Sequence, residues 1–461
     1  MNDVDVVIVG GGIAGLSAAF ELQKRGRRFV VLERAPRTGG VILSEHVDGF
    51  VVDGGPDALL TQKPEGIALC EELGIASRLV PTRPPRLAYI QRAGRLHALP
   101  ANSVLGIPTR VGPFIRTNLF TWAGKMRMAA EMFVPPRRDE GDESIGSFMR
   151  RRFGSEAVDY LAEPLLAGIH AGDVDRLSIH ALFPRFVDTE RTHGSLLRAF
   201  RRQRQAAPSP DGVFRSFPNG LSELVDALTA ALPPSSIQRN TAARRIVRDA
   251  RSGVDGWRVD SADGGTCFGR GVIVTSPAYV AADLLRDVDA ELAGLCADVP
   301  YASSATIALA FPRTAVAHPL NGSGFVVPRV EKTGIMAASW LSSKWPHRAP
   351  EGQVLMRAFV GGARDPSALD RSDDELVAVA LAALRPLLGI SGEPLFTRIY
   401  RFERKSAQHD VGHLARMARI ERLLDTRPGL FLTGSGFRGV GIPDCVADAR
   451  ATARKASECS G

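Results

Sequence analysis

The sequence has few cysteines and no pattern of them that forms a disulfide framework or a metal site. Its five cysteines are far apart, odd in number and without a Cys-X-X-Cys pair; they are Cys70, Cys267, Cys296, Cys445 and Cys459. This usage excludes a disulfide-stabilised secreted domain and indicates a reducing compartment. No metal ligand set is expected.

Long uncharged apolar runs are also lacking. No stretch reaches the roughly 18 residues that a membrane-spanning helix needs. The first residues contain Asp3 and Asp5 before a short apolar run, which is unlike a signal peptide. We therefore expect a cytoplasmic protein, with peripheral contact to a membrane left open.

The positive charge of the chain lacks the features of a nucleic-acid surface. The net charge is +8, but the basic residues are scattered, are mostly Arg and are not interleaved with aromatics. Nucleic acid is thus not an expected partner. A compositional preference for Arg and attraction to an anionic substrate or membrane both remain as explanations. The length of 461 residues indicates about two or three domains.

The most informative stretch runs from residue 4 to residue 33. An apolar run leads into Gly10-Gly11-Gly12-Ile13-Ala14-Gly15, a helical pattern follows, and a second apolar run ends at Glu33. Strand, glycine turn, helix and strand in this order are typical of a dinucleotide site. The glycines allow a tight turn, close approach of a pyrophosphate to the backbone and close helix packing, and Glu33 suits a ribose hydroxyl. Its carboxylate would repel a 2′-phosphate, which disfavours NADP.

Two additions to this unit carry a resemblance to a known family. Glu33, Arg37, Gly39 and Gly40 form an ExxxRxGG pattern, and Asp53, Gly54 and Gly55 form a DxGG turn after the strand-like residues 50–52. The combination resembles FAD-containing amine oxidases and their relatives. That resemblance implies an α/β fold, with a discontinuous Rossmann-like FAD-binding domain, an α+β substrate domain and a helical membrane or substrate subdomain.

Two later blocks resemble the protoporphyrinogen and coproporphyrinogen oxidase branch of this family. Residues 163–173, EPLLAGIHAGD, are similar to a small-residue turn after a helix that lines the substrate pocket. Residues 434–446, GSGFRGVGIPDCV, are similar to the motif at the flavin end of the cofactor, where a helix N-terminus stabilises negative charge on the ring. Cys445 matches the porphyrinogen type, so non-covalent FAD is expected.

The resemblance implies a set of site residues and a division of the chain. The FAD contacts would come from Gly10, Gly11, Gly12, Ile13, Ala14, Gly15, Glu33, Arg34, Gly39, Gly40, Val41, Gly55, Pro56, Asp57, Ala58, Ala243, Gly434, Ser435, Val440, Gly441 and Ile442, and the substrate contacts from Gly168, His170 and Ala171. The FAD-binding domain would comprise 1–85, 216–295 and 411–461, and the substrate domain 86–215 and 296–410.

The implied reaction is oxidation of a porphyrinogen to a porphyrin, with six electrons removed in three flavin cycles and dioxygen as the acceptor. Relatives specific for protoporphyrinogen IX carry a propionate-binding arginine where this chain has Val104, whereas the residues around it resemble the Gram-positive form. Coproporphyrinogen III is therefore the favoured substrate and protoporphyrinogen IX the alternative. An amine or carotenoid oxidase and a non-catalytic FAD protein are the competing classes.

Several features stay open at this level. His170 is either a general base or a packing residue, and no catalytic residue is assigned. Residues 111–136 mix aromatics, Met and basic residues, which fits a helix of the substrate domain or a membrane-contacting segment. A homodimer is also open.

Overall fold

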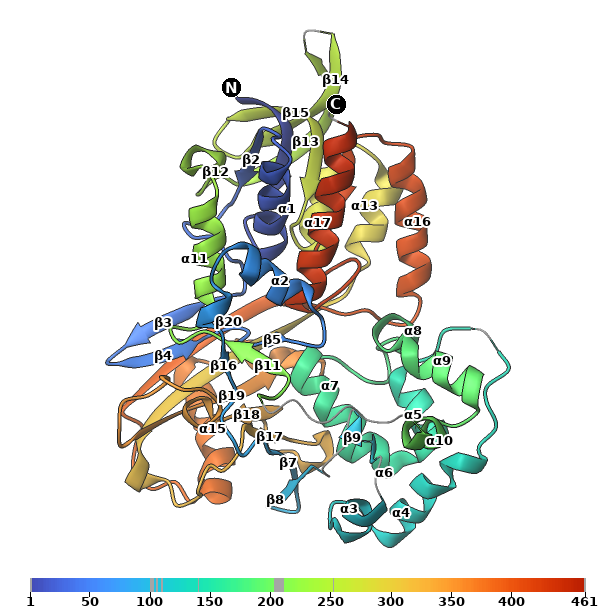
Figure 1. Ribbon diagram of the computed structural model, residues 1–461, viewed down its shortest axis with the longest axis vertical. Helices are drawn as coiled ribbons and strands as arrows, with labels where there is room; N and C mark the ends of the chain where they lie inside the picture. Colours follow the sequence, from blue (N-terminus) through green and yellow to red (C-terminus); the bar gives the residue numbers. More distant parts are fainter. Residues whose placement is uncertain are drawn as a thin grey trace.

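The computed structural model describes residues 2–99, 103–104, 107–108, 111–139, 141–202, 211–251 and 253–459. Figure 1 shows a sheet with flanking helices in the upper half, a second sheet at the lower left and a helical region at the lower right. Both chain ends lie in the upper half. The Val104 backbone is described, but its side chain and residues 105–106 lie outside the described part.

The first sheet has the strand order β12-β2-β1-β15-β14-β13, with β21 pairing with β15 beyond the end of β14. The strands β12, β2, β1, β15 and β21 run parallel, as expected for a dinucleotide domain, while β13, β14 and β15 are antiparallel. Their bounds are β1 Asn2–Val9, β2 Phe29–Leu32, β12 Ile237–Gln238, β13 Ala243–Arg251, β14 Val254–Ser261, β15 Thr266–Val274 and β21 Leu430–Leu432.

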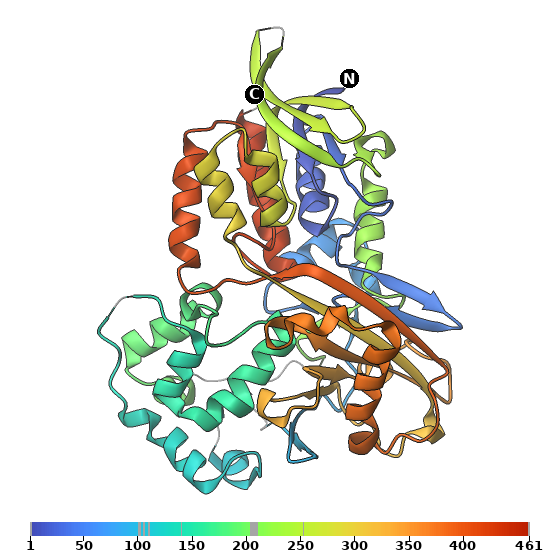
Figure 2. The ribbon, with the colours of Figure 1, turned by 180° about the vertical axis from the view of Figure 1, so that it is seen from behind.

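Helices cover both faces of this sheet, which explains why β1 and β2 are apolar without alternation. One face packs on α1 Ile13–Lys24, α2 Glu65–Glu72, α11 Ser222–Ala231 and α17 Ile442–Cys459. The other packs on α12 Ala278–Leu285, α13 Ala290–Ala297 and α16 His413–Asp425, which lie in front in Figure 2. The apolar spacing of the sequence thus forms two buried layers around one sheet.

The second sheet has the order β20-β16-β19-β18-β17-β7-β8. The helix α15 Asp373–Leu388 packs on it, and β7 and β8 form an antiparallel hairpin at its edge. The strand bounds are β7 Ala88–Arg92, β8 Arg95–Ala98, β16 Tyr301–Pro312, β17 Gly324–Val326, β18 Ala337–Ser339, β19 Gln353–Gly361 and β20 Phe396–Ala407, and α14 Leu341–Lys344 lies between β18 and β19.

The remaining strands form three small sheets. Their bounds are β3 Ser44–Val47 with β4 Phe50–Asp53, β5 Leu59–Leu60 with β11 Phe214–Ser216 and β6 Val80–Pro81, and β9 Ser103–Val104 with β10 Ile107–Pro108. The buried side chains Phe50 and Val52 of β4 pack against the second sheet. This contact joins the glycine turn after β4 to both sheets.

The helical region has its own core. Its helices are α3 Val111–Arg116, α4 Trp122–Ala129, η2 Ala130–Phe133, α5 Ile145–Phe153, α6 Ser155–Ala157, the π-helical turn η3 Val158–Ala162, α7 Glu163–His170, α8 Ile179–Leu182, α9 Pro184–His193 and α10 Leu196–Arg202. In Figure 1, α7 lies directly below α2 and α17. The helical region therefore places α7 at the junction with the first sheet.

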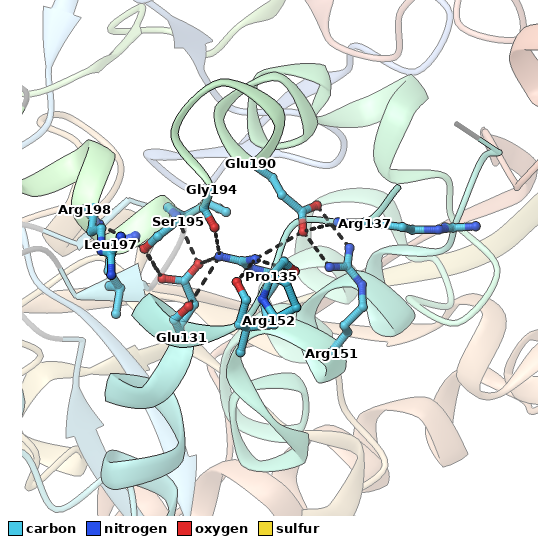
Figure 3. Close-up of polar contacts among 12 residues, drawn as sticks. Glu131, Pro135, Arg137, Arg151, Arg152, Glu190, Gly194, Ser195, Leu197 and Arg198 are labelled. Carbon is cyan, nitrogen blue, oxygen red and sulfur yellow. Dashed lines mark hydrogen bonds and ion pairs between the residues drawn. The ribbon is translucent and has the colours of Figure 1, made fainter. Parts of the chain in front are cut away.

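A buried ion-pair network joins these helices (Figure 3). The fully buried Arg152 of α5 pairs with Glu131 of η2 and with Glu190 of α9, at 3.2 Å to Glu190 Oε1. The Glu131 carboxylate also accepts hydrogen bonds from the Ser195 hydroxyl and from backbone N–H groups at the start of α10. Because loss of one partner would leave a buried charge, this network fixes α5, α9 and α10 relative to one another.

Candidate functional site

The glycine turn between β1 and α1 and the segment at residues 39–40 form a shared backbone surface with few side chains, which we call the slot. Gly10 has a φ of +109°, which favours glycine. A Cβ added to Gly12 would meet no atom closer than the Gly40 Cα at 4.0 Å, and one added to Gly40 would lie 3.4 Å from the Gly12 Cα. The Gly39 N–H donates to the Gly11 carbonyl at 2.8 Å, so the two glycine segments lie side by side.

The start of α1 is suited to an anion. No described side chain caps this helix, and its first turn has no acidic residue. Its free N–H groups therefore open onto the backbone surface that Gly12 and Gly40 form together, on which a pyrophosphate could lie. A Cβ on Gly15 would lie only 1.9 Å from the Gly10 carbonyl oxygen, which is the close helix packing expected of this glycine.

Glu33 follows β2 and has a contact that the sequence did not indicate. Its Oε2 accepts a hydrogen bond from the Gly11 N–H at 2.7 Å, and its Oε1 accepts one from the Ala35 N–H at 2.8 Å. Each carboxylate oxygen keeps a further lone pair for a ribose hydroxyl. Glu33 thus both shapes the glycine turn and could hold a ribose.

Residues 241–243 lie beside this acid. The Thr241 N–H donates to the Glu33 carbonyl at 2.8 Å, and the Ala242 carbonyl accepts from the Ala262 N–H at 2.8 Å. Ala243 then begins β13, while the Arg34 side chain is exposed. The structure therefore brings Ala243 near Glu33.

The turn after β4 is held by buried ion pairs rather than being free. Asp53 pairs with Arg348 at 2.9 Å, and both side chains are fully buried. A Cβ on Gly55 would lie 1.9 Å from the Val41 carbonyl oxygen, so these two segments touch through backbone. The turn is thereby locked against residues 39–41.

Asp57 directs its carboxylate to the second sheet. It accepts hydrogen bonds from Lys344 Nζ at 2.7 Å and Trp345 Nε1 at 2.8 Å, and Arg357 lies at 3.3 Å. Burial alone would raise the pKa of Asp57, but the charges of Lys344 and Arg357 outweigh it and hold this pKa well below its usual range. The backbone of residues 55–58, and not the Asp57 carboxylate, is what remains for a cofactor.

The C-terminal motif forms a loop between β21 and α17. Gly434 has a φ of +112°, and α17 begins at Ile442. The Cys445 thiol donates to the Gly439 carbonyl at 3.4 Å, and burial raises the pKa of this thiol to about 12. A protonated thiol turned into its own loop fits a flavin that is not covalently attached.

The predicted turn of the substrate pocket starts later than the sequence indicated. Gly168 and His170 belong to the last turn of α7, and only Ala171, with a φ of +51°, begins the turn. Pro164 is tolerated because it lies in the first turn of the helix, and η3 runs into α7 without a break. The expectation of a turn at Gly168 and His170 is therefore corrected to a helix end.

The end of α7 presents an apolar surface with little side chain. Gly168 is exposed, Ile169 is 63% exposed, and a Cβ on Gly168 would lie 3.3 Å from the Val326 Cγ1 of β17. Ala171 is buried, and its carbonyl accepts from the Ala363 N–H at 2.8 Å. The surface consists of backbone and an aliphatic side chain, which suits a flat apolar ligand.

A charged pair that sequence reasoning missed lies beside His170. Lys63 Nζ is 2.6 Å from Asp444 Oδ2, in the first turn of α17. Burial and the Lys63 charge lower the pKa of His170 to about 4, against the opposing charge of Asp444. His170 is thus neutral near pH 7, and α7, α17 and the loop before α2 meet here. No motif marks Lys63, since the pair joins residues 381 positions apart.

Two whole-molecule observations complete the description. Among the described residues, no helix combines the length and apolarity needed to cross a bilayer. Within the same part of the chain, no group of three or more His, Cys, Asp or Glu side chains is arranged to hold a metal ion.

Comparison with known proteins identifies similar chains over the full length. Residues 13–457 match the model of the flavin-containing amine oxidoreductase family. A coproporphyrinogen III oxidase of Bacillus subtilis is 36% identical over 97% of this chain and 96% of its own, and one of Staphylococcus aureus is 32% identical over 98% of both. A crystal structure assigned as a protoporphyrinogen oxidase, from Exiguobacterium sp. 255-15, superposes with a TM-score of 0.87 at 33% identity and covers 99% of both chains.

Proposed function

The chain belongs to the flavin-containing amine oxidoreductase family, and on this premise we propose that it oxidises coproporphyrinogen III to coproporphyrin III. It is an oxidoreductase, and its cofactor is FAD. The alignments with the relatives named for this substrate cover nearly all of this chain and nearly all of each relative. The similarity therefore includes the helical region and α7 as well as the dinucleotide unit.

The observation that carries the proposal is the juxtaposition of α7 with the loop and helix of the C-terminal motif. Gly168 and Ile169 are exposed at the end of α7, and the next residue, His170, lies near the ion pair that Lys63 forms with Asp444 of the first turn of α17. A porphyrinogen has a broad apolar face and carboxylates at its rim. The α7 end suits the apolar face, and Lys63 offers a cation to a carboxylate.

We propose that the dinucleotide part of FAD lies on the backbone surface that residues 10–15 and 39–41 form together. The N-terminus of α1 would hold the pyrophosphate, Glu33 the adenosine ribose, and the backbone of residues 55–58 and 434–442 the flavin half. Residues 1–85, 216–295 and 411–461 would then form the FAD-binding domain, with the substrate domain formed by 86–215 and 296–410.

The chemistry divides between cofactor and protein. Bound FAD supplies the two-electron acceptor for each of three oxidations, with dioxygen as the final acceptor. The protein positions the ring against α7, and the dipole of α17 favours negative charge at the flavin end. Because the pKa of His170 is about 4, this imidazole is a weak base, and we assign it to the pocket wall rather than to proton abstraction.

Turnover assays test the proposal. The purified protein should be yellow and should convert coproporphyrinogen III to a fluorescent porphyrin, with uptake of dioxygen. A higher specificity constant for protoporphyrinogen IX would instead favour the alternative that the Exiguobacterium structure represents. A flavin-containing protein that oxidises amines and neither porphyrinogen would contradict the substrate class.

We also propose that the helical region touches an anionic membrane surface. Trp122 is 66% exposed, Met126 67% and Phe133 78%, and they follow one side of α4 and η2, near the exposed Ile115 of α3. The only acidic residue from 111 to 138 is the buried Glu131, whereas Arg116 and Arg138 are exposed. An apolar stripe with basic neighbours and no exposed acid suits negatively charged lipids.

Vesicle sedimentation tests this contact. The wild type should bind vesicles of phosphatidylglycerol and phosphatidylcholine and should not bind phosphatidylcholine alone. Changing Trp122 and Met126 to Ser together should abolish the binding, whereas Leu395→Ser, at a residue 52% exposed on the second sheet side, should not. Absence of vesicle binding together with a dimer that the double change dissociates would instead make the stripe a homodimer interface.

A further inference from the structure

Two buried histidines lie directly behind the loop at the flavin end. His409 follows β20, and His413 is the first residue of α16. Their rings stack with a centroid distance of 3.9 Å and an interplanar angle of 9°. His409 Nε2 lies 3.1 Å from the Ser435 carbonyl oxygen, and His413 Nε2 lies 2.7 Å from the Phe437 carbonyl oxygen. Both rings therefore contact the backbone of the same short loop.

The geometry fixes the protonation of the pair. A carbonyl accepts only, so each Nε2 must carry the hydrogen. His413 Nδ1 is buried and has no hydrogen-bond partner among the described residues, so a proton there would be unsatisfied. Two imidazolium rings at this separation would also repel each other. The stacked arrangement therefore excludes two charged rings, and the unpartnered Nδ1 keeps His413 neutral.

The charged neighbours do not reverse this conclusion. Burial is the largest influence and lowers the pKa of both rings, that of His409 to about 3. For His409, the nearby His413 and His170 act in the same direction. For His413, Arg416 lowers the pKa and Asp142 raises it, without overcoming burial. The pair is neutral throughout the physiological range.

The segment that carries the two histidines also contacts the pocket side. Gln408 Nε2 donates to the His170 carbonyl at the end of α7, at 2.9 Å. The His409 carbonyl accepts from the Ser178 N–H at 2.9 Å, and Asp142 Oδ2 accepts from the Gly412 N–H at 3.0 Å. Residues 408–413 therefore connect α7 and the helical region to the loop of residues 435–437.

We propose that His409 and His413 are positioning residues for the flavin: as a neutral stacked pair they hold the carbonyls of Ser435 and Phe437 and so set the loop that receives the flavin ring. Gln408 ties the same segment to α7, which fixes the position of the pocket wall relative to that loop. Neither histidine is proposed to touch the substrate. The proposal rests on the family cofactor and on the flavin-end location of residues 434–442, and it requires no particular substrate.

The experiment compares Leu and Gln substitutions at both positions. Gln places an N–H donor near the position of His Nε2, whereas Leu fills similar volume without a donor. His318→Leu serves as the control. The His318 ring also packs against a buried aromatic side chain, Trp340, at a centroid distance of 5.0 Å, and it accepts a hydrogen bond from the Leu320 N–H that the variant would lose. Each variant is purified with FAD, and FAD affinity, the flavin absorption spectrum and the melting temperature of the FAD-free protein are measured.

We expect His413→Leu to weaken FAD binding roughly tenfold and to shift the flavin absorption bands, His409→Leu to do so less, and both Gln variants to stay near the wild type. The control should lower the melting temperature and leave the bands unchanged. Wild-type FAD affinity and spectrum in both Leu variants would overturn the proposal. So would equal loss of FAD in His318→Leu, since the effect would then follow general stability. Because no porphyrinogen is used, this outcome is independent of the proposed substrate.

Discussion

The glycine turn after β1 and the end of α7 each contain a glycine with a close neighbour. For Gly15 the neighbour belongs to the same turn, whereas for Gly168 it belongs to a distant part of the chain. A Cβ on Gly15 would collide with the carbonyl of Gly10, five positions earlier. A Cβ on Gly168 would first meet Val326 in β17 of the second sheet. We call the glycine turn with α1 the cofactor side and the end of α7 the pocket side. Contacts within one turn–helix unit therefore define the cofactor side. The pocket side exists only once the helical region has docked on the second sheet.

Gly15→Val would break the cofactor side most completely. The branched side chain has to displace the Gly10 carbonyl, 1.9 Å from the ideal Cβ, so we expect loss of FAD and destabilisation of about 3 kcal/mol. Gly294→Val is the matched control, since Gly294 also lies in a helix and an added Cβ meets nothing within 4 Å. Thermal unfolding and the flavin content of the purified proteins measure the difference. Full FAD content in Gly15→Val would show that this turn is misplaced.

Gly168→Glu would break the pocket side alone. A charged side chain on the exposed α7 surface should abolish porphyrinogen oxidation while leaving the flavin spectrum normal, because no part of the proposed FAD slot comes from α7. Gly168→Ala, which needs only a small shift of Val326 from 3.3 Å, should keep most of the activity. Normal turnover by the Glu variant would place the substrate elsewhere.

Glu33→Ala tests how far the cofactor side depends on one acid. The change removes the acceptor for the Gly11 N–H and the proposed ribose contact, so FAD affinity should fall about ten- to a hundredfold, or on the order of 1.5–3 kcal/mol. Titration of the FAD-free protein with FAD measures this, and circular dichroism should report an unchanged fold. Undiminished affinity would remove Glu33 from the site.

The smallest of these effects should be a pH dependence of the free energy of unfolding. We expect it to arise from His409, which lies between the cofactor side and the pocket side. His409 has a pKa near 3 in the folded protein and about 6.5 when unfolded, so the unfolded chain binds more protons below pH 6.5. The contribution of neutral His409 to the free energy of unfolding is complete above pH 6.5 and declines as the pH falls toward 3. Between pH 7 and 5 this amounts to about 2 kcal/mol. Urea unfolding at both pH values should show a smaller difference for His409→Gln than for the wild type; an identical difference would exclude His409 as a source.

The sequence predicted the cofactor side better than the pocket side for a physical reason. The contact between Gly15 and the Gly10 carbonyl follows from backbone geometry within one strand–turn–helix unit, and the helix after Gly441 begins as the motif indicated. The end of α7 was misplaced because local patterning does not show that η3 continues into α7 through residue 170.

Long-range side-chain contacts could not be predicted at all. The Lys63–Asp444 pair and the bonds from His409 and His413 to residues 435 and 437 join segments that carry no shared periodicity. The Glu33 contact with Gly11 was also missed, although Glu33 itself was identified, because the sequence does not show where a carboxylate points. Residue type and spacing therefore indicated which segments the structure brings together at the glycine turn, and tertiary packing decides the partners of their side chains.

The most direct test of the account is anaerobic reduction of the bound flavin by each porphyrinogen. With dioxygen absent, coproporphyrinogen III should bleach the flavin absorption in a single rapid phase in the wild type, and it should leave the flavin of Gly168→Glu oxidised. Protoporphyrinogen IX should bleach the wild type more slowly. Failure of both porphyrinogens to reduce a flavin that dithionite reduces normally would contradict the proposed reaction, and a preference of at least about tenfold for protoporphyrinogen IX would contradict the assigned substrate.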